Sequence, residues 1–415
     1  SRREGGKIFG GGSRSPIAIT LLVKNPDAKA HGQIQFHDIG DALTRDQKLA
    51  IIREFGSIAG ITASVGWDQI TPDEHGDWLR QRDEGFADFI VIGDKKSDGG
   101  KLFENFSLGV ATNRDWWCFN SSRQSLEANM RRMIGFYNDE VTRFEKAFAG
   151  LAKKARQEAV DGFVNPDPTM ISWTVNLKQE VARGRRLAFD DSCVFPALHR
   201  PFCKKWLYFN RILNERVLQM PRLFPHSGAE NRAIMIKQRW SGDGQLALMV
   251  DRVVELQTDG GAQCFPLYLY EKATDDEEDA EDSLFAKAKS GAKEADSYTR
   301  RDGISDAGLK HFQAAYPTPG EGDTITKEAR FYYIYGLLPS PDYRSRYADN
   351  LGKELPRIPA VKTFADFMAF SQAGRELAHW HLNYETVEPH QGVDLDTGKT
   401  PLAKLTDADF RVEKM

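Results

Sequence analysis

The sequence predicts a mixed fold, in which an α/β part is followed by an α+β part with a helical C-terminal portion. Three observations support this prediction. Strand-like apolar runs alternate with a helix-period stretch over residues 1–92, and a long amphipathic stretch with further strand-like runs follows. The final quarter carries aromatic residues at helix spacing behind Ser and Thr caps. At 415 residues, the chain is long enough for two or three domains with buried cores.

The first part contains three strand-like runs and one helix. Residues 16–23 form an apolar run that suits a buried strand, and residues 33–36 alternate as a second strand. Residues 44–55 have helical spacing, with Thr44 as the N-cap, and residues 86–92 form a third apolar run. We expect the glycines before residue 16 to form a hairpin turn, because a phosphate-binding loop would follow a strand and open a helix.

The second part begins with a long helix. Ser122 caps it, Gly150 ends it, and apolar residues from Leu126 to Phe148 recur every three or four positions, which predicts a core-facing stripe. Arginines near the other face are either solvated or phosphate-facing: Arg123, Arg131, Arg132 and Arg143. Strand-like runs then follow at 233–237, 247–250 and 264–270, an acidic insertion or linker at 271–300, and helices from Ser305, Thr326, Ser340 and Thr363.

Charge is unevenly distributed along the chain. The formal net charge is -4, yet residues 101–216 hold nineteen Lys or Arg against thirteen Asp or Glu. Because a local basic excess attracts phosphate, the basic half is the candidate binding half. The four cysteines lie far apart without metal-ligand spacing, which indicates reduced thiols in a cytoplasm. No apolar run is long enough to span a membrane.

The densest polar stretch is Gly109 to Asn120. It places Thr112, Asn113, Arg114 and Asp115 in succession, immediately before the long helix. A buried strand does not need four such groups, because each buried polar group needs a partner and each charge needs a counter-charge. We expect these four side chains to face a ligand or another segment of the chain.

A second dense stretch, Arg200 to Arg216, interleaves basic and aromatic residues. Its aromatic rings can hold the segment on a core while four basic side chains reach outward: Arg200, Lys204, Lys205 and Arg211. That arrangement presents positive charge to a nucleic-acid backbone. A half-buried sheet with a solvated charged face is the alternative interpretation.

Several stretches together resemble the C-terminal region of type ISP restriction-modification enzymes and related single-chain adenine methyltransferases. The resemblance implies that residues 1–92 are the last strands and helices of an adenine-N6 methyltransferase domain, as an incomplete Rossmann-like sheet. It implies a DNA target-recognition domain over residues 93–270, with the long helix at 122–149, and a helical C-terminal part of that domain over 301–415. The matching runs follow the family's order: residues 7–26, 36–41, 70–79, 109–120, 200–216, 263–268, 325–347 and 354–359.

Members of this family resemble one polypeptide that joins a nuclease, an ATP-driven DNA translocase, an adenine methyltransferase and a specificity domain. The motifs that bind the methyl donor and the flipped adenine are absent from this sequence, as is a GxxxxGK[ST] loop. We therefore expect a fragment of a bacterial cytoplasmic protein, with no catalytic residue, metal or cofactor of its own. S-adenosylmethionine, ATP and Mg²⁺ are implied for the full-length protein, and the implied partners are double-stranded DNA and the upstream domains.

This resemblance suggests roles for two groups of residues. Base readout needs bidentate amides or guanidinia on protruding loops, and a polar, glycine-containing break between two strand-like runs supplies them: Lys237, Gln238, Arg239 and Gln245. Arg114 either contacts DNA or pairs with Asp115 to fix the junction between the two domains.

Two other function classes remain open. One is a protein-interaction scaffold in which the helical end of the chain and the acidic insertion dominate. The other is a free-standing hydrolase that uses His37, Asp38 and His75. His37, Asp38 and Asp41 lie close together, so they form either a metal or acid/base site or a loop whose side chains bond to backbone.

Overall fold

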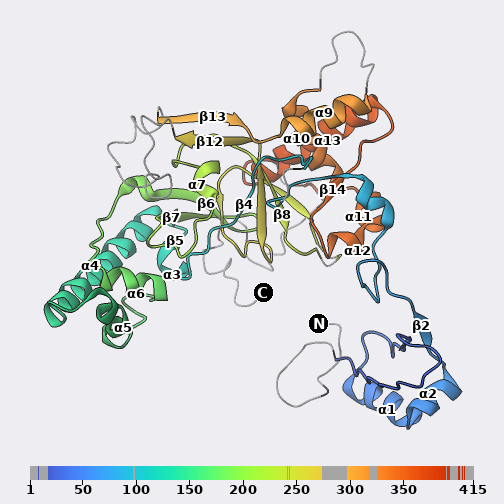
Figure 1. Cartoon of the computed structure of the whole chain (residues 1–415). Helices are drawn as coiled ribbons and strands as arrows, with labels where there is room; N and C mark the ends of the chain where they lie inside the picture. Colours follow the sequence, from blue (N-terminus) through green and yellow to red (C-terminus); the bar gives the residue numbers. More distant parts are fainter. Residues whose placement is uncertain are drawn as a thin grey trace. The chain divides into compact units, whose positions relative to one another are not determined.

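The computed structural model describes residues 8, 17–96, 99–240, 242, 244–272, 297–316, 325–388, 390–392, 401, 404 and 406. The chain divides into two compact units, residues 1–86 and residues 87–415 (Figure 1).

The described part of the first unit holds a small antiparallel sheet and two helices. β1 (Ile34–Phe36) pairs with β2 (Asp68–Ile70), and α1 (Arg45–Phe55) and α2 (Ile58–Ser64) lie between them in sequence. The Thr44 hydroxyl accepts from the Gln47 N–H, and the Gln47 side chain accepts from the Thr44 N–H, which confirms the predicted cap of α1. Neither helix contains a buried residue.

The prediction of a strand at residues 16–23 is wrong for residues 17–23, which are the residues of this run that the structure describes. Residues 17–23 form no strand, and Ile19, Leu22 and Val23 are 86%, 85% and 81% exposed. An apolar strand needs neighbouring strands and a covering layer, and the described residues of this unit supply neither. The expected Rossmann-like sheet is not seen in these residues either, because β1 and β2 run antiparallel. The predicted glycine turn lies outside the described residues.

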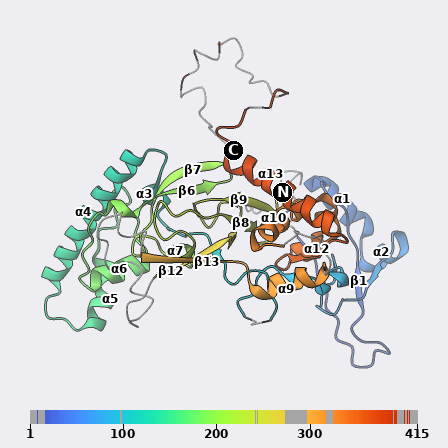
Figure 2. The same ribbon diagram turned by 90° about the horizontal axis from the view of Figure 1, so that it is seen from above.

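One sheet of the second unit is built around a β-hairpin. In the described residues its strand order is β10–β6–β7–β5. Its two central strands, β6 and β7, lie side by side in Figures 1 and 2. β6 (Val194–Arg200) and β7 (Cys203–Tyr208) are antiparallel, and β5 (Phe119–Asn120) extends the sheet beside β7. β10 (Val253–Val254) pairs parallel to β6.

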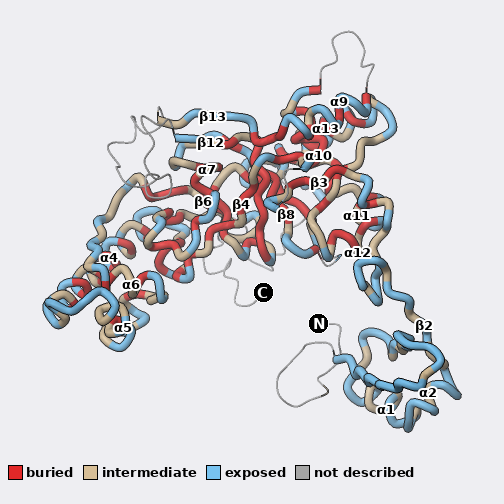
Figure 3. Tube along the Cα trace, in the orientation of Figure 1, coloured by how far each residue is buried: buried red, intermediate tan, exposed pale blue. Residues whose placement is uncertain are grey.

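A second sheet is antiparallel throughout and has the order β4–β11–β8–β9 in the described residues. Its strands are β4 (Ser107–Leu108), β8 (Ala233–Lys237), β9 (Ala247–Val250) and β11 (Ala262–Pro266). Every residue of β9 and β11 is buried, as are the first four of β8, so this sheet lies in the core (Figure 3). The mixed helix and sheet composition agrees with the predicted class.

The long predicted helix is α4 (Arg123–Ala147). The Ser122 hydroxyl accepts from the Ser125 N–H at 3.2 Å, which confirms the cap. Leu126, Met130 and Phe144 belong to a fully buried stripe, so the predicted core face is also confirmed. α5 (Lys153–Phe163) and α6 (Val175–Ala182) pack against each other, and α6 also packs against α4. The arginines of α4 lie over aromatic rings: Arg123 over Trp206, Arg131 over Phe189, Arg132 over Trp117 and Arg143 over Phe163.

The C-terminal part of the second unit is helical. α10 (Lys327–Leu337) and α13 (Phe364–Leu382) are its main helix pair, and the predicted caps at Ser305, Thr326 and Thr363 are confirmed. A Cβ at Gly374 would lie 2.0 Å from the Tyr332 carbonyl oxygen, so the close approach of these two helices requires glycine there. The shorter helices are α9 (Asp306–Ala315), α11 (Pro341–Arg346) and α12 (Ala348–Leu351).

Short elements complete the second unit. β3 (Ile90–Val91) pairs with β14 (Arg357–Ile358), and β12 (Tyr268–Lys272) pairs with β13 (Tyr298–Asp302). The two ends of the acidic segment expected at 271–300 therefore lie in paired strands, and residues 273–296 lie outside the described residues. The remaining short helical elements are α3 (Asp115–Cys118), α7 (Met220–Leu223), η1 (Glu84–Asp88) at the boundary of the two units, and η2 (Asp191–Cys193).

Candidate nucleic-acid interface

Gly109 leads the predicted polar stretch to the place where the two sheets meet. The Gly109 N–H donates to the Ala262 carbonyl in β11 at 3.2 Å, and the Val110 N–H donates to the Val254 carbonyl in β10 at 2.8 Å. A Cβ at Gly109 would lie 2.6 Å from the Glu255 carbonyl oxygen, so only glycine permits this approach. The polar residues that follow therefore start beside strands of both sheets.

Arg114 is a structural residue. Its side chain is only 2% exposed. Nε donates to the Ser172 carbonyl at 3.1 Å, and the two terminal nitrogens donate to the Thr174 hydroxyl at 2.9 Å and to the Leu213 carbonyl. Burial lowers the pKa of the guanidinium. The expectation that Arg114 faces another segment of the chain is confirmed, because its hydrogen bonds go to these three segments. They do not go to Asp115, so the predicted pair between the two residues is wrong. The predicted contact of Arg114 with DNA stays a prediction, and the guanidinium is buried in this conformation.

Asp115 binds to other partners than the one expected. Its carboxylate accepts from the Thr112 hydroxyl and lies 3.7 Å from Nε2 of His199. The His199 imidazole, and to a smaller extent the Thr112 hydroxyl, hold the pKa of Asp115 below its usual value. Thr112 is buried in this conformation, whereas Asn113 is exposed. Of the four predicted residues, Asn113 is exposed, and the Asp115 side chain is 39% exposed although it is engaged by Thr112 and His199.

Three of the predicted cations form ion pairs: Arg200, Lys204 and Lys237. Arg200 pairs with Glu255 at 2.7 Å, and Lys237 pairs with Asp259 at 3.4 Å. Burial and the nearby Asp115 raise the pKa of Glu255, and the Arg200 guanidinium opposes that rise. These carboxylates reduce the positive charge that the cations can offer to phosphate.

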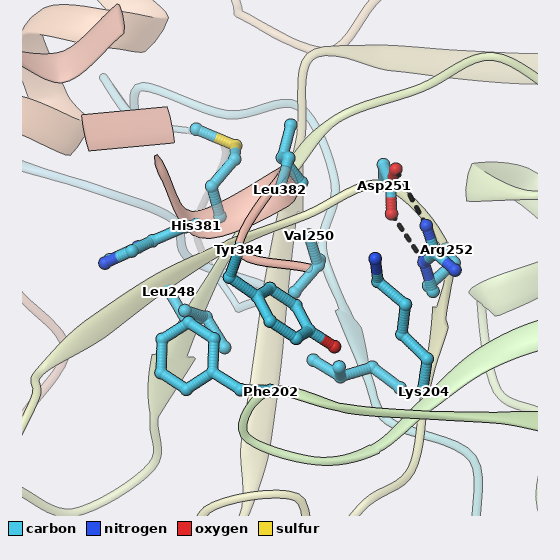
Figure 4. A pocket seen from close by; sticks show the side chains of 11 residues that line it. Phe202, Lys204, Leu248, Val250, Asp251, Arg252, His381, Leu382 and Tyr384 are labelled. Atoms are coloured by element: carbon cyan, nitrogen blue, oxygen red, sulfur yellow. Dashed lines mark hydrogen bonds and ion pairs between the residues drawn. The ribbon is translucent and has the colours of Figure 1, made fainter. Parts of the chain in front are cut away.

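Lys204 joins the first sheet to the C-terminal end of α13. Its ammonium pairs with Glu385 at 2.7 Å and lies 4.5 Å from the ring centroid of Tyr384. Phe202, in the β6–β7 turn at φ 55°, packs edge-on against Tyr384 and His381. Figure 4 shows these side chains around a small pocket beside β9. We interpret the pocket as a packing junction, because apolar side chains line much of it and its charged groups are paired.

The predicted reading loop connects β8 to β9. Trp240 anchors it: the indole is buried, its N–H donates to the Gly244 carbonyl at 3.3 Å, and the Arg344 guanidinium lies over its ring. Gln238 and Arg239 precede this anchor and are exposed, whereas Gln245 is half-buried. The loop therefore has a fixed base and presents one amide and one guanidinium to solvent.

Lys205 and Arg239 form no ion pair within the part of the chain that the structure describes. Lys205 lies in β7 opposite Ala197, and it is half-buried. Arg211 is exposed in the turn that follows β7. Of the predicted cations, Arg211 and Arg239 are therefore exposed, and Lys205 is in part accessible to solvent.

Sequence reasoning did not select Trp116. Its indole is 91% exposed, while the adjacent Trp117 and Cys118 are buried. The Arg132 guanidinium lies 5.0 Å from the ring centroid of Trp117 and is exposed. Two tryptophans in succession within a helix point in different directions, so the Trp-Trp pair indicated that one of them would be exposed.

The residues of the hydrolase hypothesis form no catalytic arrangement. His37 packs edge-on against Phe55 and Trp67, and Asp38 accepts the Gly40 N–H at 2.8 Å, as expected for a loop. Across the described residues, no group of His, Cys, Asp or Glu suits a metal ion, and the four cysteines are free thiols. No described helix is both long enough and apolar enough to cross a membrane.

Solved structures of restriction-modification enzymes are similar to this chain. One is a nuclease-deletion mutant of the type ISP enzyme LlaGI in complex with a DNA substrate mimic. It is 34% identical to this chain with a TM-score of 0.73, and the match covers 94% of this chain and 27% of the LlaGI chain. The ATP-dependent type ISP enzyme LlaBIII bound to DNA is 28% identical with a TM-score of 0.71, and the match covers 90% of this chain and 21% of the LlaBIII chain. The protein of a DrdV–DNA complex is 27% identical with a TM-score of 0.68, and the match covers 87% of this chain and 32% of the DrdV chain. The chain thus spans between a fifth and a third of the length of these proteins.

A family model settles the resemblance drawn from the sequence. No curated protein sequence matches the chain. The model of the type ISP C-terminal specificity domain, however, matches residues 101–415. Because this match covers most of the chain, the protein belongs to the type ISP C-terminal specificity domain family.

Proposed function

We propose that the chain recognises a short sequence in double-stranded DNA as the specificity part of a restriction-modification adenine-N6 methyltransferase. It positions the target adenine for an upstream S-adenosylmethionine-dependent core and directs restriction. The observation that carries this proposal is the family match over residues 101–415, together with similar proteins solved in complex with DNA. Extruding an adenine costs a few kcal/mol of stacking and pairing energy, which contacts along the flanking duplex supply.

The contacts divide into two kinds. Lys205 and Arg211 hold phosphates and set the register of the protein on the duplex, without reading sequence. The exposed Gln238 and Arg239 enter a groove and read base edges, each good bidentate pair discriminating by about 1–3 kcal/mol. The buried Trp240 supports this role, because a reading residue needs a rigid base.

Residues 1–92 are the C-terminal strands and helices of the methyltransferase domain, and upstream methyltransferase and helicase-nuclease domains complete the protein. The exposed apolar residues at 17–23 and the helices without buried residues support this part of the proposal, since both require a covering surface. The similar enzymes are also several times longer than this chain.

S-adenosylmethionine, ATP and Mg²⁺ belong to those upstream domains. The sequence has no donor-binding or phosphate-binding motif, and its described residues contain no suitable cluster of metal ligands. The residues of this chain therefore do not fit any of the three groups, and its own contribution is binding and orientation of DNA.

Selection from a library of random duplexes, at two salt concentrations, tests the proposal. We expect the chain to enrich one short asymmetric motif, and the variant with Gln238→Ala and Arg239→Ala to lose that preference. Lys205→Ala is the matched control: it should weaken all sequences alike and reduce the salt slope by about one. Failure of the folded wild-type chain to bind any duplex would refute DNA recognition and favour the scaffold alternative.

A further inference from the structure

Two guanidinia from different elements are held against one buried tyrosine, Tyr332 of α10. Arg375, in α13, lies over the ring with its Cζ 4.3 Å from the ring centroid. Arg232, immediately before β8, donates to the Tyr332 hydroxyl, and its Cζ lies 5.8 Å from the same centroid. Because Tyr332 is fully buried, it fixes both cations in place.

Both guanidinia line one cavity of about 180 Å³, which we call the α13 cavity. Its lining residues are Arg232, Arg375, Ala378, His379, Leu382 and Asn383, and none of them is acidic. Arg232 and His379 are exposed, so the cavity opens to solvent. Pockets for whole small molecules usually measure about 300–1,000 Å³, so this one suits a single small group.

The α13 cavity carries more positive charge than its neighbours neutralise. Glu328 pairs with Arg375 at 2.9 Å, whereas Arg232 forms no ion pair with a described residue. The C-terminal end of α13 contributes about half a negative charge, which reduces this excess without cancelling it. Two cations on one ring also repel each other, so an anion between them is favoured.

His379 adds a neutral donor to the cavity. The Asn383 Nδ2 lies 3.1 Å from Nδ1 of His379 and 2.9 Å from its carbonyl oxygen. An amide nitrogen only donates, so Nδ1 accepts and the neutral imidazole carries its proton on Nε2. Guanidinium and imidazole donors without a carboxylate in the lining are the chemistry of an oxyanion site.

We propose that the α13 cavity holds one phosphate of the DNA backbone, with Arg232, Arg375 and the Nε2–H of His379 as donors. A backbone phosphate carries one negative charge, which matches the one guanidinium that lacks a carboxylate. This inference rests on the proposed DNA recognition and deepens it, because it assigns a phosphate contact away from the reading loop. Such a contact adds affinity without sequence preference.

One duplex can reach both the α13 cavity and the reading loop. Arg232 precedes β8 and Gln238 follows it, so at the rise of a strand the two residues are about 20 Å apart. That distance corresponds to about six base pairs along a duplex, since each pair adds about 3.4 Å.

Binding of the 415-residue chain to a random-sequence duplex, measured over a series of salt concentrations, tests this site. Arg232→Ala should weaken binding about tenfold and lower the slope of log affinity against log salt by about one, because one phosphate contact is lost. Arg232→Lys should keep the wild-type slope but recover only part of the affinity, since an ammonium lacks the planar fork of donors.

Two further variants separate the cavity from a general loss of charge or fold. His379→Ala, at an exposed position, should weaken binding about two- to tenfold with an unchanged slope, because a neutral donor is lost. Arg300→Ala is the matched control: it removes an exposed guanidinium that lies 4.3 Å from the ring centroid of Tyr268 in β12, outside the α13 cavity. It should bind like wild type.

Three results would overturn the inference. If folded Arg232→Ala binds the duplex with wild-type affinity and slope, the contact is refuted while DNA recognition stands. If, in addition, inorganic phosphate binds to wild type at constant ionic strength but not to Arg232→Ala, the cavity holds a free phosphate instead of DNA. Absence of duplex binding by folded wild type, in contrast, would refute the proposed function and this contact together.

Discussion

Replacement of Arg114 provides the strongest test of the interface geometry. Arg114→Ala removes a guanidinium that is 2% exposed and leaves the Ser172 carbonyl, the Thr174 hydroxyl and the Leu213 carbonyl without their donor. Each buried acceptor without a partner costs about 1–3 kcal/mol, and Arg114→Ala leaves three of them. We therefore expect the free energy of unfolding to fall by about 3–5 kcal/mol.

Urea denaturation at equilibrium measures this change. Arg114→Ala should lower the midpoint without changing the slope, because the surface exposed on unfolding stays the same. Arg114→Lys should lose about 2 kcal/mol, since an ammonium keeps the charge but cannot reproduce the planar arrangement of three donors. Lys146→Ala, at an exposed position in the last turn of α4, is the control and should stay within about 0.5 kcal/mol of wild type.

The opposite pattern would refute this reasoning. If Arg114→Ala unfolds at the wild-type urea concentration, yet binds every duplex more weakly with a flatter salt dependence, then the guanidinium contacts phosphate. The buried conformation of Arg114 would then not be the one that binds DNA.

Three further predictions follow from the same region. Gly109→Ala should destabilise the fold by about 1–3 kcal/mol in thermal unfolding, because its Cβ would lie 2.6 Å from a backbone oxygen, whereas Gly135→Ala, with open space, should stabilise α4 by up to about 1 kcal/mol. In salt-dependent DNA binding, Lys204→Ala should have little effect because its ammonium is already paired, whereas Lys205→Ala should weaken binding to all sequences. The lowered pKa of Asp115 stabilises the fold above its ordinary value of 3.8, and this contribution is lost as the pH falls through the folded pKa. As the pH falls through that range, the free energy of unfolding of Asp115→Asn should therefore decrease less than that of wild type. The same decrease in both proteins, measured by denaturation at several pH values, would contradict the stabilising role of the Asp115 carboxylate.

Local chemistry made much of the fold predictable. The helix starts at Thr44, Ser122, Ser305, Thr326 and Thr363 were all identified correctly, because a cap depends on a hydroxyl and a backbone N–H only a few residues apart. The core stripe of α4 was identified for the same reason, since residues three and four positions apart share one helix face.

The errors arose where distant residues decide the outcome. Arg114 binds oxygens that lie 58, 60 and 99 positions away in the sequence, and no local pattern reveals such partners. The run at 17–23 has the composition of a buried strand, but composition cannot show whether neighbouring strands are present to pair with it. A polar or apolar segment is thus assigned correctly only when its partners are known.

The structure separates the residues that hold the candidate interface from those that face solvent. Gly109, Arg114 and Trp240 are fixed by close backbone approach or burial, and changes at these positions act on the stability of the whole unit. Gln238 and Arg239 are exposed, so replacing them should change stability by no more than about 0.5 kcal/mol. A domain that distinguishes DNA sequences benefits from this separation, because exposed side chains on a fixed base can be exchanged, and the recognised sequence altered, without unfolding the protein that presents them.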